Sequence, residues 1–447
     1  MRIRIAVVVV LLVALLVLPP VFGKVAESRV TAHIESLREK QLDITIDEYE
    51  RGWFSSRARI TLKPSQLHPS AALLADVLDP LTVAVDIRHG PVSLADGFFL
   101  GMFETYARPV DDSPVVDFVV EAQTTLDGSV NFAVEIMPLR HDFADGRVNL
   151  SGARASGTIE RRRVDARGEL ASLEIASPTG AVSMIGVRAS TDTERHSGRV
   201  APGTLSVEVD RIAFERFENS SQAFDATGVR FASRSSVDRA LNRLHGRAVF
   251  AFEQARTGNG ATITDARYEM SLRNVDVAAL EAYYDLVADG APAEPSMDVV
   301  APIVQRLVAS SPSFAIDTVR FHVDGQPFEA SLHVDVDSSV PPSGGAVDLN
   351  DPEYWRSILK GRAGLSAAKP LVEQLAAAGI KVQLLAAQED GASMPTDSLD
   401  ALAEAQVGLV LGMLSAQGMI EDTGSLYRTT LSFENGRITV NGQPLPF

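Results

Sequence analysis

Histidine is the side chain that most often binds zinc or transfers protons near neutral pH, and the chain contains eight histidines. None belongs to an H-x-H or H-E-x-x-H pair, the spacings that bring two imidazoles to one metal ion. The eight are His33, His68, His89, His141, His196, His245, His322 and His333. His322 and His333 are the pair that a β-hairpin could bring together, but no carboxylate or thiolate pattern accompanies them. The sequence predicts no metal site and no cofactor.

The sequence also lacks the common motifs for a nucleophile or for phosphate binding. The chain has no cysteine, which excludes thiolate nucleophiles, disulfides and thiolate metal sites. No G-x-S-x-G or P-loop motif is present, and Gly258-Asn259-Gly260 is interpreted as a hairpin turn between two strand-like runs. Adjacent acids such as Asp111 and Asp112 stand beside Ser113-Pro114 and are typical of a solvated loop. We predict no catalytic residue and a protein that is not an enzyme.

One short segment is unusual because it holds three aromatic residues in a chain that is 6% aromatic. Its sequence is Tyr49-Glu50-Arg51-Gly52-Trp53-Phe54-Ser55-Ser56. The glycine stands at a predicted hairpin bend. Two interpretations stay open: Trp53 and Phe54 cover the start of the sheet or enter the headgroup region of a membrane, or they dock a partner.

The first 24 residues predict an export signal that stays in the membrane. Arg2 and Arg4 precede a charge-free run over residues 5–23, and Lys24 follows it. Nineteen helical residues span roughly 30 Å, about the hydrocarbon thickness of a bilayer. Pro19 and Pro20 shorten the most apolar part, so a cleaved signal peptide stays open as the alternative, although no clean cleavage site follows. The basic residues before the run predict that the body lies outside the cytoplasm.

Residues 42–272 are dominated by alternation of apolar and polar residues, the period of a β-strand. An amphipathic helix over residues 25–41 precedes them, and strand-like runs then recur to residue 272, separated by turns rich in Gly, Asp, Asn, Ser and Pro. This pattern predicts an extended antiparallel sheet, a sandwich or a partly open barrel rather than a parallel α/β fold.

Helical patterns are confined mainly to the last third. Helices are expected after Asp276, over residues 298–309, in a segment ending at Gly379, and over residues 397–417. Strands are expected over residues 314–323, 328–336 and 380–385, and a hairpin over residues 427–440 turns at Asn435-Gly436. The apolar helix over 397–417 is interpreted as a core helix, with a second membrane contact as the alternative. The fold class is therefore β-rich α+β, with an N-terminal membrane helix.

The amino-acid composition limits the classes of partner that the protein can bind. Forty-one basic and 58 acidic residues give a net charge of −17 without a basic cluster, which excludes the electrostatic surface of a nucleic-acid binder. The hydrophobic fraction of 45% and charged fraction of 22% are typical of an ordered globular body.

Three motifs follow the apolar run that ends at Gly23, with Glu27 after it. They are the segment Tyr49 to Ser56, His89-Gly90-Pro91 at the end of a strand, and N-G-x-P at Asn441, Gly442 and Pro444. In this order they resemble the YdgA-like family of Gram-negative envelope proteins, which carries a domain of unknown function. The resemblance covers nearly the whole chain and implies a protein of the inner membrane that faces the periplasm, with no assigned reaction. These residues are carried over as structural or docking positions and not as catalytic ones.

The sequence thus predicts a signal anchor over residues 1–24, a β-rich periplasmic body over 25–336, and a C-terminal α+β sub-body over 353–447. The predicted role is a non-enzymatic interaction or scaffold module of the cell envelope, held in the inner membrane by a single pass. The alternative is a carrier of lipid or another amphiphile on a hydrophobic β-groove, by analogy with the anchored β-rich AsmA-like proteins. Its partners would be the inner membrane through residues 5–23 and lipid or another envelope protein, and not nucleic acid.

Overall fold

The computed structural model describes residues 24, 43–63, 81–90, 92–93, 99–110, 116–143, 146–217, 223–288, 297–340, 351–387 and 395–445. The predicted membrane segment and the amphipathic helix after it lie outside these residues, as do Asp111 and Asp112. The chain divides into two compact units. Unit 1 comprises residues 1–194 and 207–218, and unit 2 comprises residues 195–206 and 219–447.

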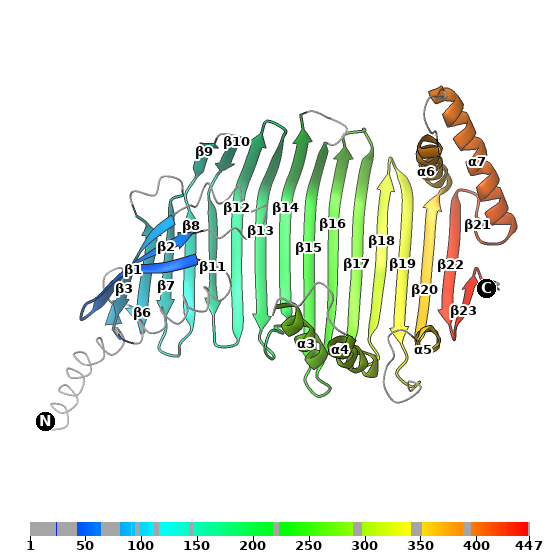
Figure 1. Ribbon diagram of the computed structural model, residues 1–447. Helices are drawn as coiled ribbons and strands as arrows, with labels where there is room; N and C mark the ends of the chain where they lie inside the picture. Colours follow the sequence, from blue (N-terminus) through cyan, green and yellow to red (C-terminus); the bar gives the residue numbers. More distant parts are fainter. Residues whose placement is uncertain are drawn as a thin grey trace. The chain divides into compact units, whose positions relative to one another are not determined.

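Unit 1 is an antiparallel sheet whose strands pair mostly in chain order (Figure 1). Its strands are β1 (Asp43–Arg51), β2 (Ser55–Lys63), β3 (Leu81–His89), β6 (Phe103–Pro109), β7 (Phe118–Thr124), β8 (Val130–Ile136), β9 (Leu139–Phe143), β10 (Gly146–Leu150), β11 (Ala153–Ile159), β12 (Arg163–Ser177), β13 (Gly180–Glu194) and most of β14 (Gly203–Arg216). The β9–β10 hairpin departs from chain order because β8 pairs with β11, and β10 pairs with the far half of β12. β4 (Val92–Ser93) and β5 (Phe99–Leu100) pair only with each other.

Unit 2 is also antiparallel, and its strands again follow the chain. They are β15 (Phe224–Asp238), β16 (Arg243–Thr257), β17 (Thr262–Asp276), β18 (Ser313–Val323), β19 (Gln326–Val336), β20 (Leu359–Ala368), β21 (Glu421–Asp422), β22 (Leu426–Glu434), β23 (Arg437–Val440) and β24 (Gln443–Pro444). β19 pairs with β20, so the strands on either side of residues 337–358 belong to one sheet.

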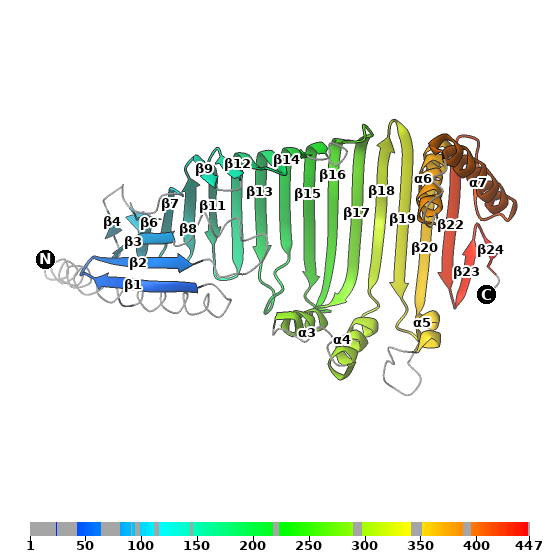
Figure 2. The ribbon, with the colours of Figure 1, turned by 45° about the horizontal axis from the view of Figure 1, so that its top comes forward.

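All five helices among the described elements lie in unit 2, which confirms the predicted β-rich fold with helices near the C-terminus. They are α3 (Val277–Ala288), α4 (Met297–Ala309), α5 (Pro352–Ile358), α6 (Lys369–Ala387) and α7 (Thr396–Ala416). Figures 1 and 2 show α3 and α4 at one end of the strands and α6 and α7 at the other, beside β20 and β22. Asp276 begins α3 as expected, because its Oδ1 accepts a hydrogen bond from the amide of Ala279 at 2.8 Å.

Two turns occur where the sequence predicts them. Asn435 and Gly436 have φ of 51° and 73°, the left-handed pair that a two-residue hairpin requires, and they join β22 to β23. Gly258 to Gly260 lie between β16 and β17, as predicted. His322 and His333 do not meet: His322 is opposite Pro327, and His333 is opposite Ala315.

The prediction of a helix end at Gly379 followed by a strand over 380–385 is wrong. α6 continues through this region to Ala387. The alternating Ile380, Val382 and Leu384 suggested a strand, but these residues belong to the helix, in which Val382 remains exposed. A Cβ at Gly379 would contact nothing within 4 Å, so the glycine only weakens the helix locally and does not end it.

Candidate functional site

The sheet of unit 2 presents two chemically opposite faces. Residues paired directly across antiparallel strands share a face, so the registers define rows of side chains that cross the sheet. One row crosses seven strands from β15 to β22: Phe231, Phe250, Tyr268, Val319, Ala330, Leu365 and Thr429. The next row on this face is Ser233, Ala248, Met270, Ile316, Leu332, Ala363, Leu431 and Val440. Neither row contains a charged residue. We call this surface of unit 2 the apolar face.

The opposite face is polar. One of its rows is Arg267, Arg320, Glu329, Ser366 and Arg428. Because adjacent residues of a strand point to opposite faces, Leu365 and Ser366 lie on the two sides of β20. A sheet with one apolar and one polar face normally packs its apolar face against another layer of structure.

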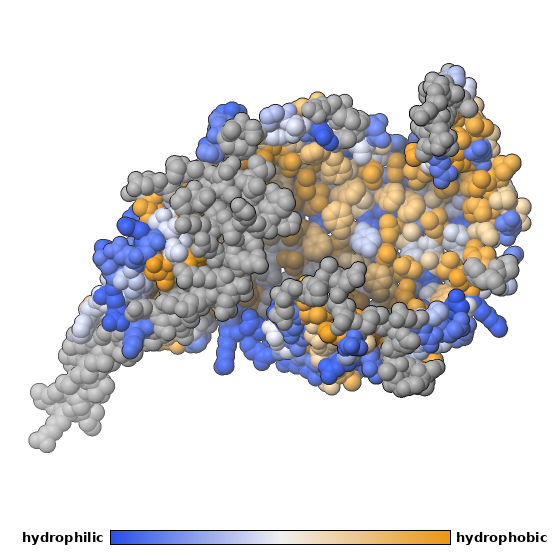
Figure 3. Space-filling model, in the orientation of Figure 1, coloured by the Kyte–Doolittle hydropathy of each residue, from blue (hydrophilic) through white to orange (hydrophobic). Residues whose placement is uncertain are grey.

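The described helices leave the middle of the apolar face open. Large side chains there remain accessible to solvent: Leu365 is 37% exposed, and Phe250, Leu272, Phe314 and Leu431 are similar. Figure 3 shows a broad hydrophobic surface over the strands β15 to β22. α6 contacts only the end of this face, where Ala367 and Leu371 are buried. The apolar face is therefore a continuous accessible surface of hydrocarbon groups.

A cavity of about 980 Å³ lies where α6, α7 and β22 meet. Asp422 and Tyr427 line it, and the Lys369 ammonium lies 2.6 Å from a carboxylate oxygen of Asp422 and 5.2 Å from the centre of the Tyr427 ring. The Tyr427 hydroxyl donates to Glu373 of α6 at 3.3 Å. Burial, followed by the negative charge of Glu373, raises the pKa of Tyr427 above its usual value. These contacts attach the start of α6 to the end of the apolar face.

Two S-x-x-K spacings escaped the motif reasoning and are the strongest sequence signal for a serine nucleophile with a lysine base. They are Ser357 with Lys360 and Ser366 with Lys369. A lysine base needs a depressed pKa, but hydrogen bonds to Asp337 and Asp422 raise the pKa of Lys360 and of Lys369 respectively. Both ammonium groups are thus held protonated by carboxylates, which argues against catalysis at either pair.

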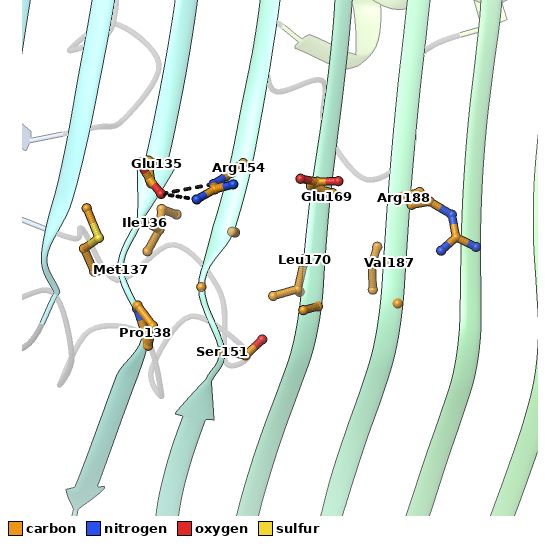
Figure 4. Close-up of a pocket in the computed structure, with 14 residues that line it drawn as sticks. Glu135, Ile136, Met137, Pro138, Ser151, Arg154, Glu169, Leu170, Val187 and Arg188 are labelled. Carbon is orange, nitrogen blue, oxygen red and sulfur yellow. Dashed lines mark hydrogen bonds and ion pairs between the residues drawn. The ribbon is translucent and has the colours of Figure 1, made fainter.

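In unit 1, charged side chains form a row, or ladder, across one face of the sheet. Figure 4 shows Glu135, Arg154, Glu169 and Arg188 in one row on successive strands. Arg154 donates to Glu135 through two nitrogens at 3.0 and 2.8 Å, and Arg188 lies 2.6 Å from Asp210 on β14. The hydrogen bond to Arg188 lowers the pKa of Asp210. A surface depression of about 410 Å³ borders this row, in which acidic and basic side chains alternate.

On the polar face of unit 2, the carboxylate of Glu269 is paired with two arginines. Its side chain is 8% exposed; one oxygen accepts from Arg267 at 2.7 Å, and the other accepts from Arg247. The bond from Arg267 is the largest cause of a lowered pKa at Glu269, and the contacts with Arg247 add to it against the cost of burial. The two arginines that cover the carboxylate are themselves well exposed, so water still reaches the cluster.

Replacing Glu269 with glutamine is expected to reduce the free energy of unfolding of the full chain by roughly 1–2 kcal/mol at pH 7. Because the folded pKa lies below the unfolded value near 4.5, the carboxylate stabilises the fold fully above that value, and the contribution disappears as the pH falls through the folded pKa. Urea unfolding at pH 7 and at successively lower pH measures this. Glu253→Gln, at an exposed carboxylate 3.8 Å from Arg230, is the control and should show no difference. A Glu269→Gln effect that persists unchanged in acid contradicts the assignment.

The structure brings together two of the three family motifs. The first forms the turn from β1 to β2, in which the Gly52 amide donates to the Ser55 carbonyl at 2.7 Å. His89 lies at the end of β3, its Nε2 3.1 Å from the Ser56 hydroxyl, and both side chains are buried. The His89 amide donates to the Phe54 carbonyl at 2.9 Å, and the Gly90 amide donates to the Met102 carbonyl at 3.2 Å. These bonds fix the turn to the neighbouring strands.

The remaining motif residues divide between structural and exposed positions. Tyr49, Glu50 and Arg51 continue β1 opposite Ala58, Arg57 and Ser56, and Pro91 lies outside the described residues. Trp53 is 56% exposed and Phe54 is similar, so neither covers the sheet.

The third motif belongs to unit 2. The Asn441 Oδ1 accepts from the Thr430 amide at 2.8 Å, and its Nδ2 donates to the Gly418 carbonyl at 2.9 Å. Gly442 follows with φ of 76°. Asn441 thus ties β22 to the loop after α7.

Ser56→Ala is expected to lower the free energy of unfolding of unit 1 by roughly 1–3 kcal/mol, because His89 loses a buried hydrogen-bond partner that water does not replace. Chemical unfolding, with hydrogen exchange of the β2 and β3 amides, measures the change. Ser55→Ala is the matched control, since the Ser55 side chain is exposed. Equal stability of the two variants contradicts a structural role for the Ser56–His89 bond.

Within the described ranges, no group of three or more His, Asp or Glu side chains is arranged to hold a metal ion. A family model matches residues 1–447 and is described as "Bacterial protein of unknown function (DUF945)". No curated protein and no solved structure matches the chain. The match extends over both units and all three motif segments, and the chain accordingly belongs to the DUF945 family of bacterial proteins of unknown function.

Proposed function

We propose that this protein is a non-enzymatic, membrane-tethered envelope protein that binds the hydrocarbon chains of a lipid or similar amphiphile on the apolar face of unit 2. The observation that carries this proposal is the row from Phe231 to Thr429, which crosses seven strands without a charged side chain and stays accessible to solvent. A surface that offers almost no hydrogen-bonding group suits a ligand that needs none.

A hydrocarbon ligand fits this face better than a protein partner does. Protein interfaces are roughly 56–65% apolar and include polar groups, with arginine enriched among the residues that dominate affinity. The two central rows of the apolar face contain no arginine, and their polar side chains are hydroxyls at the margins, Ser233 and Thr429, together with the Tyr268 phenol. Selectivity for a partner protein would need polar contacts that this surface lacks.

The dimensions and energies also suit acyl chains. Seven strands at about 4.8 Å spacing span roughly 29 Å, while one leaflet of a bilayer is roughly 15 Å thick in its hydrocarbon part. Each methylene that leaves water contributes about 0.8 kcal/mol, so ten methylenes on this face would contribute roughly 8 kcal/mol before the cost of ordering the chain.

The proposed location rests on the sequence. The charge-free run over residues 5–23 favours a single-pass anchor in the inner membrane, with both units in the periplasm. The ordered motifs that resemble YdgA-like proteins support the same placement. An anchored body would work beside a large supply of lipid.

Site-specific photocrosslinking in cells tests the binding function. A photoreactive amino acid at position 365 of the full chain is expected to give adducts with the mass of membrane lipids, while the same residue at position 366, on the polar face, gives none. Peptide adducts at position 365 would show that a protein or a second copy covers the face and would overturn the proposal. Equal lipid adducts at both positions would overturn it as well.

A second candidate function is docking of an envelope protein at the β1–β2 turn, as expected of a scaffold module. The observation that favours it is the exposure of the neighbouring aromatics Trp53 and Phe54 on a turn fixed by the Ser56–His89 bond. A photoreactive residue at position 53 should then capture one defined protein, and Phe54→Ala should reduce that capture. Adducts with lipid alone would assign the turn to the membrane surface instead.

A further inference from the structure

α7 is packed on one side only. Leu399, Ala403, Val407 and Leu411 recur every four residues and are all buried. They form the stripe that faces the body of unit 2, where α6 is the helix in contact with α7 (Figure 2). The Lys381 ammonium of α6 lies 2.5 Å from Asp400 and strengthens this pairing. One face of the helix therefore has the environment of a core helix, as the sequence predicts.

The other side of α7 is apolar as well, and it is exposed. Leu409 is 72% exposed, and Leu402 and Met413 are also exposed. Their spacing of seven and four residues places them in one line, about 120° around the helix from the centre of the buried stripe. We call Leu402, Leu409 and Met413 the outer stripe. From Ala405 to Ile420 the chain has no charged residue.

α7 has the composition of a membrane helix. Among the described helices, it is the one long and apolar enough to cross a bilayer, over Ser398–Ala416, yet only 22% of its most apolar window is buried. A core helix of a soluble body would be mostly buried. The prediction of a core helix thus accounts for one face and leaves the outer stripe unexplained.

We infer that α7 lies in the surface of a lipid bilayer, with Leu402, Leu409 and Met413 inserted among the acyl chains. Because the buried stripe is held against α6, α7 presents only its outer side and lies along the interface rather than across the membrane. The outer stripe consists of unbranched or γ-branched aliphatic side chains without Trp, Tyr or Arg, which are the residues that usually anchor a protein partner. Hydrocarbon is the environment that matches it.

This inference rests on the proposed function and deepens it. α6 begins at the end of β20, and its Glu373 accepts from Tyr427, which shares the apolar face with Ala367. The α6–α7 pair therefore stands where the apolar face ends. An α7 seated in the membrane would bring that end to the bilayer, so an acyl chain could move onto the sheet with little exposure to water.

The absence of cysteine allows a direct test, because a single introduced cysteine can be labelled alone. The full chain carrying Leu409→Cys is labelled with a polarity-sensitive fluorophore and reconstituted in vesicles of phosphatidylethanolamine and phosphatidylglycerol at about 3:1, a composition with modest negative charge. Arg234→Cys, at an exposed residue of β15 on the polar face, is the control. Lipids brominated in their acyl chains then report contact with hydrocarbon.

The expected result is a blue-shifted emission at position 409 that brominated lipids reduce roughly twofold, with no change at position 234. Emission at 409 that matches the control means that the stripe stays in water and overturns the inference. A blue shift without quenching means that protein covers the stripe and overturns it equally. The two proposals can fail separately. If only the lipid-binding proposal fails, the lipid adducts at position 365 are absent while the quenching at position 409 remains.

Discussion

Replacing Leu365 with aspartate is expected to reduce the lipid that co-purifies with the full chain at least tenfold. Leu365 lies on the apolar face, between Ala330 and Thr429 on the neighbouring strands. A carboxylate there must either stay ionised against hydrocarbon or take up a proton at pH 7, which costs roughly 4 kcal/mol for a group with an ordinary pKa near 3.9. Extraction of the purified protein and quantification of lipid per chain by mass spectrometry measures the loss.

Ser366→Asp is the matched control, one residue away on the same strand and on the opposite face. It introduces the same charge into the row that already holds Glu329 and Arg428, so the bound lipid should not change. Because Leu365 is partly exposed in the folded protein, Leu365→Asp should fold, which circular dichroism verifies. Equal lipid content in the two variants would contradict binding on the apolar face.

Gly157→Val is expected to destabilise the centre of unit 1 by about 3 kcal/mol, although valine is a far better strand former than glycine. Gly157 on β11 stands opposite Ala166 on β12. A Cβ at position 157 would overlap the carbonyl oxygen of Asp165 and lie 2.8 Å from the Cα of Ala166. Both are backbone atoms, so no rotation of a side chain relieves the contact, and the two strands must separate.

Hydrogen exchange of the β11 and β12 amides locates this effect, and chemical unfolding gives its size. Ser156→Val is the control, since it adds the same side chain on the other face of β11. That variant should keep or slightly increase the protection of the same amides. If Gly157→Val exchanges no faster than Ser156→Val, the close approach of the two strands is not present in solution.

Sequence patterns anticipated strands such as β18 and β19 because these strands keep one apolar and one polar face. Residues 314–323 and 328–336 alternate almost without interruption and form β18 and β19 within one or two residues of the expected bounds. β20 was missed because its sequence, Leu359 to Ala368, is rich in glycine and alanine, which have low strand propensity. Its place between β19 and β22 stabilises it as a strand despite that composition.

The candidate site was less accessible to sequence reasoning. Alternation shows that a strand has an apolar face, but it cannot show whether another layer covers that face. Leu409 illustrates the same limit in a helix: its surroundings in the sequence are those of a core position, and only the packing on α6 shows which side remains outside. The Ser56–His89 bond joins residues 33 positions apart, and its signal was that both belong to motifs of one family.

The pairing of strands in chain order also determines how this protein can change in length and how it unfolds. From β16 to β19, each strand pairs with the strands before and after it in the chain. Such a sheet behaves as a linear array of neighbouring units, whose stability is a sum of strand terms and interface terms. Whole hairpins can therefore be gained or lost in evolution without rerouting the rest of the chain, and loss of order should spread inward from an edge instead of occurring everywhere at once.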